Sequence, residues 1–516
     1  MEFPRDYNAA VDFVDRHLAE GRAEKVAFLD PERRLTYGEL AADCKRLGHL
    51  LAAAGIGREA RVAMIALDTV DFPVIFWGAI RAGVVPVALN TLLTTEAYAY
   101  ILRDTRAQAL FVSAPLLPTV APLLAELPGL RKVFVLGGEP GQDLGEHTAF
   151  RPALEAQPAE LAPAETCADE VAFWLYSSGS TGRPKGVKHV HSSPMATARL
   201  YGQDLLGLAE DDLVYSAAKL FFAYGLGNAM SFPLAVGATA ALLPGRPTPA
   251  AVFQTLKAHK PSVFYGVPTL YAAILADPDC TPEAGSDRLR LCVSAGEALP
   301  KEVGKAWKAR FGVDILDGVG STEMLHIFLS NAPGAVGYGS SGRAVPGYEL
   351  RLVEEDGAEV GPGEIGELLV RGPSAAEGYW NQRAKSRRTF EGEWTRTGDK
   401  FTRDAAGTYV YCGRTDDMFK VSGIWVSPFE VESALMSHPA VLEAAVVPAE
   451  DEEGLLKPKA FVVLKEPGAE RAELTPALQD LVKEKAGPWK YPRWIDYVPD
   501  LPKTATGKVQ RFKLRG

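Results

Sequence analysis

The segment Tyr176–Lys188, with the sequence YSSGSTGRPKGVK, holds the residues whose chemistry is easiest to interpret. Its small hydroxyl residues and glycines allow backbone N–H groups to approach an anion closely, and Lys185 adds a positive charge. The apolar run VAFWL precedes it, so we expect the segment to follow a strand. Its spacing differs from that of the common P-loop motif GxxxxGK[ST], because neither Ser nor Thr follows the lysine. A flexible Ser/Gly-rich linker is the alternative, but the flanking order predicts a phosphate-binding loop.

This loop is expected to belong to a parallel sheet. From about residue 60, short apolar runs such as Arg61–Leu67 and Val84–Leu89 alternate with helical stretches such as Phe72–Ala82. Near-continuous apolar strands separated by helices predict a parallel sheet that is covered on both faces. A second series of such runs begins with Val171–Tyr176, directly before the loop, and continues at Ala238–Leu243, Ser262–Tyr265 and Leu289–Ser294. The sequence therefore predicts an α/β protein with two subdomains of related architecture.

The pattern changes near residue 337 and again after Gly413. Short alternating stretches (YELRLV, GELLVRG, TYVYCGR) with many Gly and Pro residues predict a small β-rich subdomain. Beyond it, helices are expected at Pro428–Ser437 and Thr475–Lys485. Strands are expected at Val441–Val447, Ala460–Leu464 and Trp494–Val498. We therefore divide the chain into an N-terminal domain, residues 1–415, and an α+β C-terminal domain, residues 416–516.

Composition limits the class of protein. The chain has 516 residues and a formal charge of −10, with acidic residues spread along its length, which argues against nucleic acid as a partner. The five cysteines are far apart and form no CxxC pair, so we expect buried, reduced thiols. The N-terminus lacks the apolar core of a secretory signal, and no apolar stretch reaches the ~18 residues of a membrane span. A soluble cytoplasmic protein without membrane contact is expected.

The phosphate-loop segment resembles the signature of the adenylate-forming superfamily, which includes acyl-CoA synthetases, firefly-type luciferases and the adenylation domains of peptide synthetases. Later segments resemble further motifs of that superfamily in the same order: DGVGSTE at Asp317–Glu323, TRTGD at Thr395–Asp399, GRTDDMFKVSG from Gly413 and PKTATGKVQR near the C-terminus. The resemblance covers essentially the whole chain and implies that the C-terminal domain is mobile. It implies an enzyme that uses ATP, Mg²⁺ and coenzyme A to convert a carboxylic acid into an acyl-adenylate and then into a thioester.

The resemblance also implies roles for individual residues. Catalysis would depend on Lys508, Glu323, Thr322 and Lys185, with Glu323 holding Mg²⁺ and Thr322 contacting the α-phosphate. The loop residues that would hold the β- and γ-phosphates are Ser177, Ser178, Gly179, Ser180, Thr181 and Gly182. The other nucleotide and CoA residues would be Asp399 and Arg414 for the ribose, Gly296, Glu297, Asp317 and Gly318 for the adenine, and Lys420, Ser422 and Gly423 for the pantetheine tunnel. Without the resemblance, Glu323 would be interpreted as an acid at a helix start and Lys508 as a solvated lysine.

The same resemblance extends to the acid-binding pocket. Amino-acid-activating relatives carry an Asp where this chain has Phe222, so an α-amino acid is not expected. The residues expected to enclose the acid are Phe222, Ala223 and Tyr224 on one side and Ala295, Gly320, His326 and Ile327 on the other. A plain aromatic core is the alternative, but bulky rings suit a short, flat acid. The stretches KLFFAYGLGNAMSFPLAVG and STEMLHIFLSN resemble benzoate–CoA ligases and their hydroxybenzoate relatives, which implies benzoate or a close ring-substituted analogue. Whether His326 bonds a ring substituent or only packs against the ring stays open.

Asp416 matches the hinge position of the superfamily. We expect the C-terminal domain to turn about Asp416 after the adenylate forms, exchanging Lys508 for the face that bears Lys420. His189 and His191, next to the phosphate loop, are expected to cap or pack there.

The alternatives are an oxidative fate of the adenylate as in luciferases, transfer of the acyl group to a carrier protein, and a regulatory nucleotide-binding protein. The last would be expected to lose Lys508 or Glu323. Another small acid, such as hydroxybenzoate, aminobenzoate or cyclohexanecarboxylate, is the alternative substrate, and either a monomer or a homodimer is compatible with the sequence.

Overall fold

The structure, a computed structural model, describes residues 1–138, 144–177, 183–421, 424–452, 455–466, 471–503 and 509–515. The chain forms two compact units. The first comprises Met1–Tyr338, Gly342–Glu349 and Val370–Thr395, and the second comprises Gly339–Ser341, Leu350–Leu369 and Arg396–Gly516.

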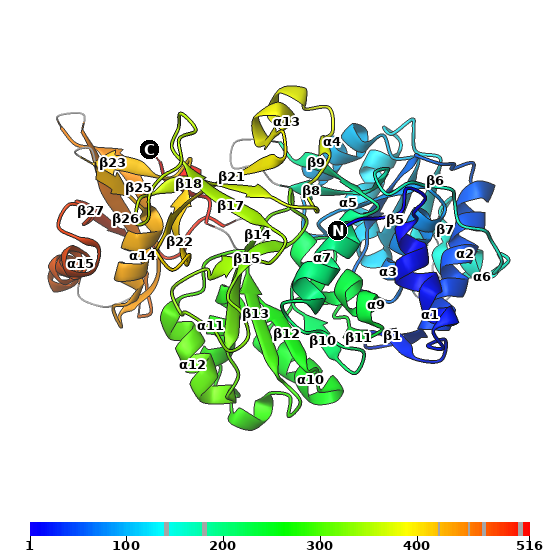
Figure 1. Ribbon diagram of the computed structural model, residues 1–516, viewed down its shortest axis with the longest axis horizontal. Helices are drawn as coiled ribbons and strands as arrows, with labels where there is room; N and C mark the ends of the chain where they lie inside the picture. Colours follow the sequence, from blue (N-terminus) through cyan, green and yellow to red (C-terminus); the bar gives the residue numbers. More distant parts are fainter. Residues whose placement is uncertain are drawn as a thin grey trace. The chain divides into compact units, whose positions relative to one another are not determined.

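An eight-stranded sheet of the first unit contains the strands on both sides of the phosphate-loop segment (Figure 1). The strand order is β19-β9-β8-β4-β3-β5-β6-β7, parallel from β8 to β7 and antiparallel at β9 and β19. The strands are β3 (Arg61–Ile65), β4 (Val85–Ala88), β5 (Ala109–Ser113), β6 (Lys132–Leu136), β7 (Thr148–Ala149), β8 (Val171–Ser177), β9 (Lys185–Val190) and β19 (Gly378–Tyr379).

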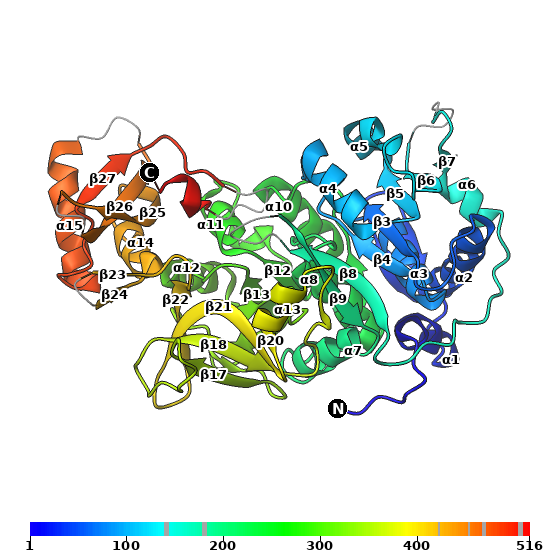
Figure 2. The same ribbon diagram turned by 90° about the horizontal axis from the view of Figure 1, so that it is seen from above.

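Helices cover both faces of this sheet, as the apolar pattern of its strands predicts. Figure 2 shows α2 and α3 on one face of β3 and β4, and α4 and α5 on the other. Ala63 and Ile65 of β3 pack in one cluster with Ile101 of α4 and Val120 of α5. The helices are α1 (Arg16–Ala19), α2 (Tyr37–Ala53), α3 (Asp71–Arg81), α4 (Thr95–Thr105), α5 (Leu117–Leu124) and α6 (Phe150–Glu155). Continuous burial of the strands explains why they are apolar throughout.

A nine-stranded sheet forms the other half of the first unit. Its order is β16-β15-β14-β13-β12-β10-β11-β1-β2, parallel from β14 to β1 and antiparallel at both ends. The strands are β1 (Val26–Leu29), β2 (Arg34–Thr36), β10 (Leu213–Ser216), β11 (Thr239–Ala241), β12 (Val263–Gly266), β13 (Leu291–Ala295), β14 (Ile315–Gly320), β15 (Ile327–Ser330) and β16 (Arg343–Ala344). The helices nearby in sequence are α7 (Ser193–Thr197), α8 (Ala223–Leu226), α9 (Phe232–Val236), α10 (Pro249–His259), α11 (Pro268–Ala276) and α12 (Lys301–Phe311).

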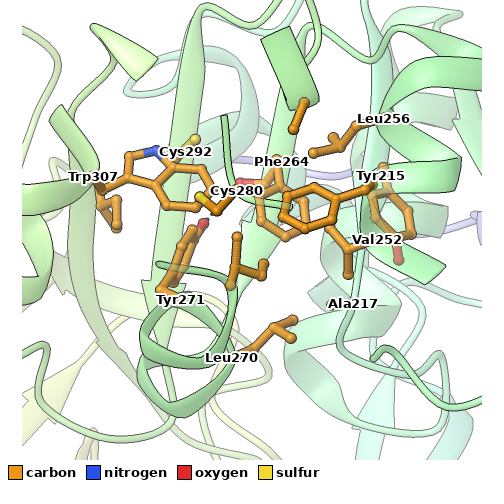
Figure 3. Packing of buried hydrophobic residues seen from close by; sticks show 14 of the residues in the cluster. Tyr215, Ala217, Val252, Leu256, Phe264, Leu270, Tyr271, Cys280, Cys292 and Trp307 are labelled. Atoms are coloured by element: carbon orange, nitrogen blue, oxygen red, sulfur yellow. Dashed lines mark hydrogen bonds between the residues drawn. The ribbon is translucent and has the colours of Figure 1, made fainter. Parts of the chain in front are cut away.

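An aromatic cluster fixes α11 and α12 on this sheet (Figure 3). Trp307 of α12 meets Tyr271 of α11 edge to face, with ring centroids 4.8 Å apart, and Tyr271 meets Phe264 of β12 at 5.4 Å. All three rings are fully buried. Such pairs add about 1 kcal/mol each beyond the burial of their area. This packing fixes the positions of strands β12 to β14. The carboxyl ends of these strands lead into the candidate site.

The second unit contains three smaller sheets. Its first sheet contains β17, β18 and β21 in that order, with β22 paired to β21; β25, β26 and β27 form another, and β23 pairs with β24. The strands are β17 (Glu349–Val353), β18 (Gly366–Arg371), β21 (Trp394–Arg403), β22 (Tyr409–Arg414), β23 (Phe419–Val421), β24 (Ile424–Val426), β25 (Val441–Glu450), β26 (Leu456–Leu464) and β27 (Trp494–Tyr497). The two-residue strand β20 (Phe390–Glu391) belongs to the first unit. Helices α14 (Pro428–Met436) and α15 (Arg471–Ala486) pack on β25 and β26 through Val431, Leu435, Leu478 and Val482.

The predicted fold class is confirmed: two α/β subdomains with mainly parallel sheets, a β-rich part and an α+β C-terminal part are all present. The assignment of Val171–Tyr176 to the second series of strands is wrong, because this strand is β8 and pairs with β4 in the eight-stranded sheet. The sequence also did not predict β1 and β2. They join the nine-stranded sheet because Phe28 and Leu29 pair with Ala240 and Ala241, a contact between distant segments that no local pattern shows.

The cysteines are free, but the expectation of buried thiols holds only in part. Cys44, Cys280 and Cys292 are buried, whereas Cys167 and Cys412 are partly exposed. Among the helices that the structure describes, none combines the length and apolar character that crossing a membrane requires.

His191 fastens the N-terminal segment to the eight-stranded sheet. The backbone N–H of Ala9 donates to Nδ1 of His191 at 3.0 Å, and the ring is almost fully buried. Burial lowers the pKa of His191 to about 4, with a smaller lowering from Arg58 and an opposing effect of Glu170. The folded protein therefore keeps a neutral imidazole that accepts a hydrogen bond.

This histidine makes stability depend on pH. Between about pH 6.5 and pH 4 the unfolded chain binds a proton at His191 and the folded chain does not, so acidification favours unfolding by up to about 3 kcal/mol. His191→Asn keeps an acceptor oxygen but cannot titrate. We expect urea unfolding at pH 7.5, 6 and 5 to show a steeper loss of stability for the wild type than for this variant. Identical pH dependence of the two proteins would contradict the assignment.

Candidate active site

Strands β8 and β9 bring together the two ends of the phosphate-loop segment. Ser177, the last residue of β8, pairs with Lys185, the first residue of β9. The predicted loop residues Ser178, Gly179, Ser180, Thr181 and Gly182 lie outside the described residues. Alternation along β9 places Lys185, Val187 and His189 on one buried face. One face of one strand thus presents the lysine of the loop and a histidine.

Glu323 lies in the turn that joins β14 to β15. Its Oε1 accepts a hydrogen bond from the Tyr379 hydroxyl at 2.8 Å, and lies 3.5 Å from both Lys185 Nζ and Ser177 Oγ. Burial would raise the pKa of this carboxyl, but the charge of Lys185 and the bond from Tyr379 outweigh it, and the pKa lies below its ordinary value. Glu323 is therefore an ionised carboxylate in a turn, and not an acid at the start of a helix.

Three donors from outside this turn hold its backbone. The carbonyl oxygens of Thr322, Glu323 and Met324 accept hydrogen bonds from His189 Nε2 at 2.8 Å, from the N–H of Ala376 at 2.8 Å and from Ser374 Oγ at 2.7 Å. The next residue, Leu325, has φ of 65°, a conformation that is unfavourable for a residue other than glycine. The turn is thus strained at Leu325, and its backbone is fixed by hydrogen bonds at the three preceding residues.

The state of His189 follows from its surroundings. Its ring stacks on Phe173 with centroids 5.3 Å apart, and burial lowers its pKa to about 4, opposed by the Thr322 bond and Glu323. A neutral ring facing a carbonyl oxygen must carry its hydrogen on Nε2, so His189 donates to Thr322. The expectation that His189 caps and packs here is confirmed.

The predicted adenine residues lie at the carboxyl ends of adjacent parallel strands. Ala295 of β13 pairs with Gly318 of β14, Asp317 precedes Gly318, and Gly296 and Glu297 follow β13 directly. Gly296 has φ of 95°, which favours glycine. In open α/β sheets, the crevice beyond these strand ends is where ligands bind.

Asp317 is held in this crevice by the backbone of the neighbouring connection. The N–H of Leu299 donates to its Oδ1 at 3.2 Å, and burial raises the pKa of Asp317 well above its ordinary value.

The predicted acid-binding residues gather around the same hairpin. Gly320 pairs with Ile327, and a Cβ on Gly320 would lie 2.6 Å from the carbonyl oxygen of His326, so only glycine fits. His326 Nε2 bonds to the carbonyl oxygen of Tyr224 at 3.2 Å and to Oδ1 of Asn228 at 3.1 Å. Burial lowers the pKa of His326 to about 3, so the imidazole is neutral and its Nε2–H is shared by these two acceptors.

The other predicted wall residues are arranged along α8. Phe222 is the residue before the helix and is half-buried, with its ring centroid 4.4 Å from that of Phe221. Ala223 is buried, and the Tyr224 hydroxyl donates to the carbonyl oxygens of Gly266 and Val293 at 3.2 and 3.1 Å. Tyr224 therefore connects α8 to the ends of β12 and β13.

The second unit contains the predicted ribose pair. Asp399 of β21 lies opposite Arg414 of β22, and Arg414 Nη1 donates to Asp399 Oδ1 at 3.1 Å. The charge of Asp399 raises the pKa of Arg414 against the effect of burial. Asp416, the predicted hinge, follows β22, and its carbonyl oxygen accepts from Arg515 Nη2 at 3.0 Å. Lys420 is an exposed residue of β23, while Ser422, Gly423 and Lys508 lie outside the described residues.

The comparison with known proteins identifies the family. A profile of AMP-binding enzymes matches residues 15–380, and a profile of the C-terminal domain of AMP-binding enzymes matches residues 430–508. The chain belongs to the AMP-binding enzyme family. The predicted adenylate-forming superfamily is thereby confirmed.

Individual relatives cover the chain from end to end. The 4-hydroxybenzoate–CoA/benzoate–CoA ligase of Rhodopseudomonas palustris is 58% identical over 516 residues, 99% of this chain and 94% of the relative. The benzoate–CoA ligase of Thauera aromatica is 57% identical over 518 residues, 100% of this chain and 97% of the relative. The crystal structure of a benzoate CoA ligase from Burkholderia xenovorans LB400 shares 50% of its residues, with a TM-score of 0.91 over 99% of this chain and 100% of that chain. The anthranilate CoA ligase AuaEII, solved with anthranoyl-AMP, gives 43% identity and a TM-score of 0.94 over 100% of this chain and 98% of that chain.

The sequence did not single out Tyr379, Ser374 or Asn228 as site residues of this AMP-binding enzyme. Tyr379 and Ser374 are more than 40 residues from Glu323 in the chain and reach it through the pairing of β19 with β9 and the contacts of the β14–β15 turn. The tyrosine in GYW resembles a core aromatic by pattern alone. Only the fold shows that its hydroxyl faces a carboxylate.

Substitution of His189 tests whether its hydrogen bond to the Thr322 carbonyl oxygen positions the turn that bears Glu323. His189→Phe keeps an aromatic ring beside Phe173 but leaves the Thr322 carbonyl oxygen without this donor. The N–H of Leu325 still donates to this oxygen, so the variant loses one of two hydrogen bonds. We expect AMP to bind about three- to tenfold more weakly, because one hydrogen bond contributes about 0.5–1.5 kcal/mol. His189→Gln keeps an N–H donor at similar reach and should restore most of the affinity. Calorimetric titration with AMP measures both, and equal losses in the two variants would contradict the positioning role.

Proposed function

We propose that this protein is an AMP-forming aryl acid–CoA ligase that acts on benzoate or a close ring-substituted analogue. The observation that carries the proposal is the identity of 58% and 57%, over essentially the whole chain, with two ligases named for benzoate. The predicted catalytic carboxylate, the loop lysine and the acid-pocket residues all converge on the β14–β15 turn in the first unit. This convergence supports chemistry at the carboxyl ends of parallel strands.

In the first half-reaction a carboxylate oxygen of the acid attacks the α-phosphorus of ATP. The bond from that phosphorus to the bridging oxygen breaks, and pyrophosphate leaves with the electron pair. Both reactants are anions, so positioning and charge compensation supply most of the catalysis. Lys185 offers a buried cation at the end of the loop, and the fixed turn presents Thr322 and Glu323 without reorganisation.

The described residues fit a magnesium ion. Mg²⁺ typically binds proteins through one or two carboxylates and completes its octahedron with substrate phosphates and water. Glu323 is such a carboxylate, ionised and at the foot of the phosphate loop. Among the residues that the structure describes, no group of three or more His, Cys, Asp or Glu side chains could form an all-protein metal site. When bound, Mg²⁺ would neutralise charge on the phosphates.

In the second half-reaction the thiol sulfur of coenzyme A attacks the acyl carbon, and AMP leaves. The thiol has an ordinary pKa of about 8.5, and a mixed anhydride is reactive enough that the proposal includes no dedicated base. Lys508 serves adenylate formation, and Lys420, Ser422 and Gly423 serve the entry of the pantetheine. Asp416 is the hinge that exchanges them.

A flat, aromatic acid suits the wall residues. Tyr224 on one side is held by two backbone carbonyls and His326 on the other by Tyr224 and Asn228, so both sides of the proposed pocket are rigid and neutral. A neutral, apolar wall favours an unsubstituted or weakly polar ring and disfavours a substituent with a second charge. An α-amino acid is excluded from the proposal because Phe222 stands where a carboxylate would pair with its ammonium group.

Substrate specificity tests the proposal directly. CoA-dependent AMP release with Mg-ATP is measured for benzoate, 4-hydroxybenzoate, 2-aminobenzoate, cyclohexanecarboxylate, hexanoate and phenylalanine, with mass-spectrometric detection of the thioester. We expect kcat/KM for benzoate to exceed that for hexanoate and phenylalanine at least about 100-fold, because a rigid pocket discriminates by several kcal/mol. Preference for hexanoate would refute the pocket assignment. Pyrophosphate release without thioester would indicate another acyl acceptor.

The hinge proposal predicts a separation of the two half-reactions. Asp416→Pro restricts φ to about −65° and so restricts rotation about this residue. We expect single-turnover formation of the acyl-adenylate to stay within about threefold of the wild type, while thioester formation falls at least about 100-fold. Rapid-quench measurements of each step give the comparison. Equal loss in both steps would refute the hinge at Asp416.

A further inference from the structure

Helix α13 (Arg383–Thr389), with the sequence RAKSRRT, lies next in the chain to Tyr379 and carries four basic residues. Three of them, Arg383, Arg387 and Arg388, are exposed, as expected for a solvated helix. Lys385 differs, because it is partly buried. A lysine that is withdrawn from solvent on an otherwise exposed basic helix requires a reason.

The helix is fastened to the strand that bears Tyr379. The Ser386 hydroxyl accepts a hydrogen bond from the backbone N–H of Tyr379 at 3.0 Å and donates to the carbonyl oxygen of Gln382 at 3.0 Å. Tyr379 in turn donates to Glu323 at 2.8 Å, and its ring lies beneath Lys185 Nζ, 4.4 Å from the centroid. Lys385, the neighbour of Ser386, thus belongs to a helix that is tied to the strand of Tyr379, the residue that contacts both Lys185 and Glu323.

The charges that act on Lys385 agree with this attachment of the helix. Burial lowers the pKa of Lys385, and the charge of Lys185 lowers it further, whereas Glu323 acts in the opposite direction. Lys385 is thus close enough to both residues to interact with their charges. Two ammonium groups and one carboxylate leave an excess of positive charge, and a magnesium ion on Glu323 would increase that excess. Like charges held together by a fold favour the binding of a polyvalent anion between them.

We propose that Lys385 is a second phosphate-binding lysine, which contacts the β- and γ-phosphates of ATP and the pyrophosphate that leaves. This inference rests on the proposed function. As the bond between the α-phosphorus and the bridging oxygen breaks, negative charge grows on the departing pyrophosphate. The ammonium group of Lys385 donates hydrogen bonds to that charge and transfers no proton. Charge-assisted bonds of this kind are shorter and stronger than neutral ones.

The proposal separates the two half-reactions, because pyrophosphate takes part only in the first. Lys385→Gln should lower benzoate-dependent ATP–pyrophosphate exchange about 100- to 1,000-fold, the usual range for one lost contact to developing charge, and raise KM for pyrophosphate in the same assay. Thioester formation from synthetic benzoyl-AMP and coenzyme A should stay at the wild-type rate. Lys385→Arg, which keeps the charge, should retain exchange within about tenfold of the wild type.

Arg387→Gln is the matched control, because it removes an exposed charge from the same helix. It should leave both half-reactions unchanged. The inference is overturned if Lys385→Gln behaves like Arg387→Gln, or if it slows both half-reactions equally, which would indicate a structural role. If the glutamine variant does not fold, Lys385→Leu takes its place. Exchange and KM for pyrophosphate equal to those of Lys385→Arg would then refute a role of the charge. Absence of benzoate-dependent exchange in the wild type would refute the proposed function. The same comparison of Lys385→Gln with Arg387→Gln, made with the acid that does support exchange, then decides the role of Lys385.

Discussion

The contact of Lys185, Glu323 and Tyr379 joins the two sheets of the first unit. Lys185 and Tyr379 belong to β9 and β19 of the eight-stranded sheet, whereas Glu323 lies between β14 and β15 of the nine-stranded sheet. A buried carboxylate is unfavourable unless a cation and hydrogen bonds compensate for its lost hydration. The eight-stranded sheet supplies the cation of Lys185 and the hydrogen bond of Tyr379, so the ionisation of Glu323 depends on the correct packing of the two sheets against each other. The same contact brings a charge suited to phosphate chemistry to the place where the halves meet.

Parallel topology determines where the other site residues lie. The strands β12, β13 and β14 point their carboxyl ends in one direction, and each is followed by a connection that contributes to the site. Glycines occur where a side chain would obstruct this geometry: a Cβ on Gly318 would lie 2.8 Å from Ile327, and one on Gly320 would meet the backbone of His326. The aromatic packing of Trp307, Tyr271 and Phe264 behind the strands keeps these ends in register.

Neutral histidines contribute positioning and not acid–base chemistry. Burial keeps His189 and His326 uncharged, and each uses Nε2 to hold a backbone carbonyl, of Thr322 and of Tyr224 respectively. One fixes the turn that bears the carboxylate, and the other fixes Tyr224, a residue of the proposed acid pocket. A site that joins two anions benefits from such arrangements, because preorganised donors need no rearrangement during the reaction.

The sequence by itself determined the family, the fold class and most of the elements, because ordered motifs and apolar periodicity are local properties of the chain. It placed Lys185, Glu323 and His326 in one site through their motifs alone. It could not show that Tyr379 donates to Glu323, that His189 holds the carbonyl of Thr322, or that β1 joins a sheet built from residues about 200 positions later. Those facts depend on pairing between distant strands, which is decided by the packing of complete sheets. The sequence thus specified the motifs that carry the chemistry. The tertiary structure decided which other side chains contact them, since only the folded chain brings distant charges and donors within a few ångströms.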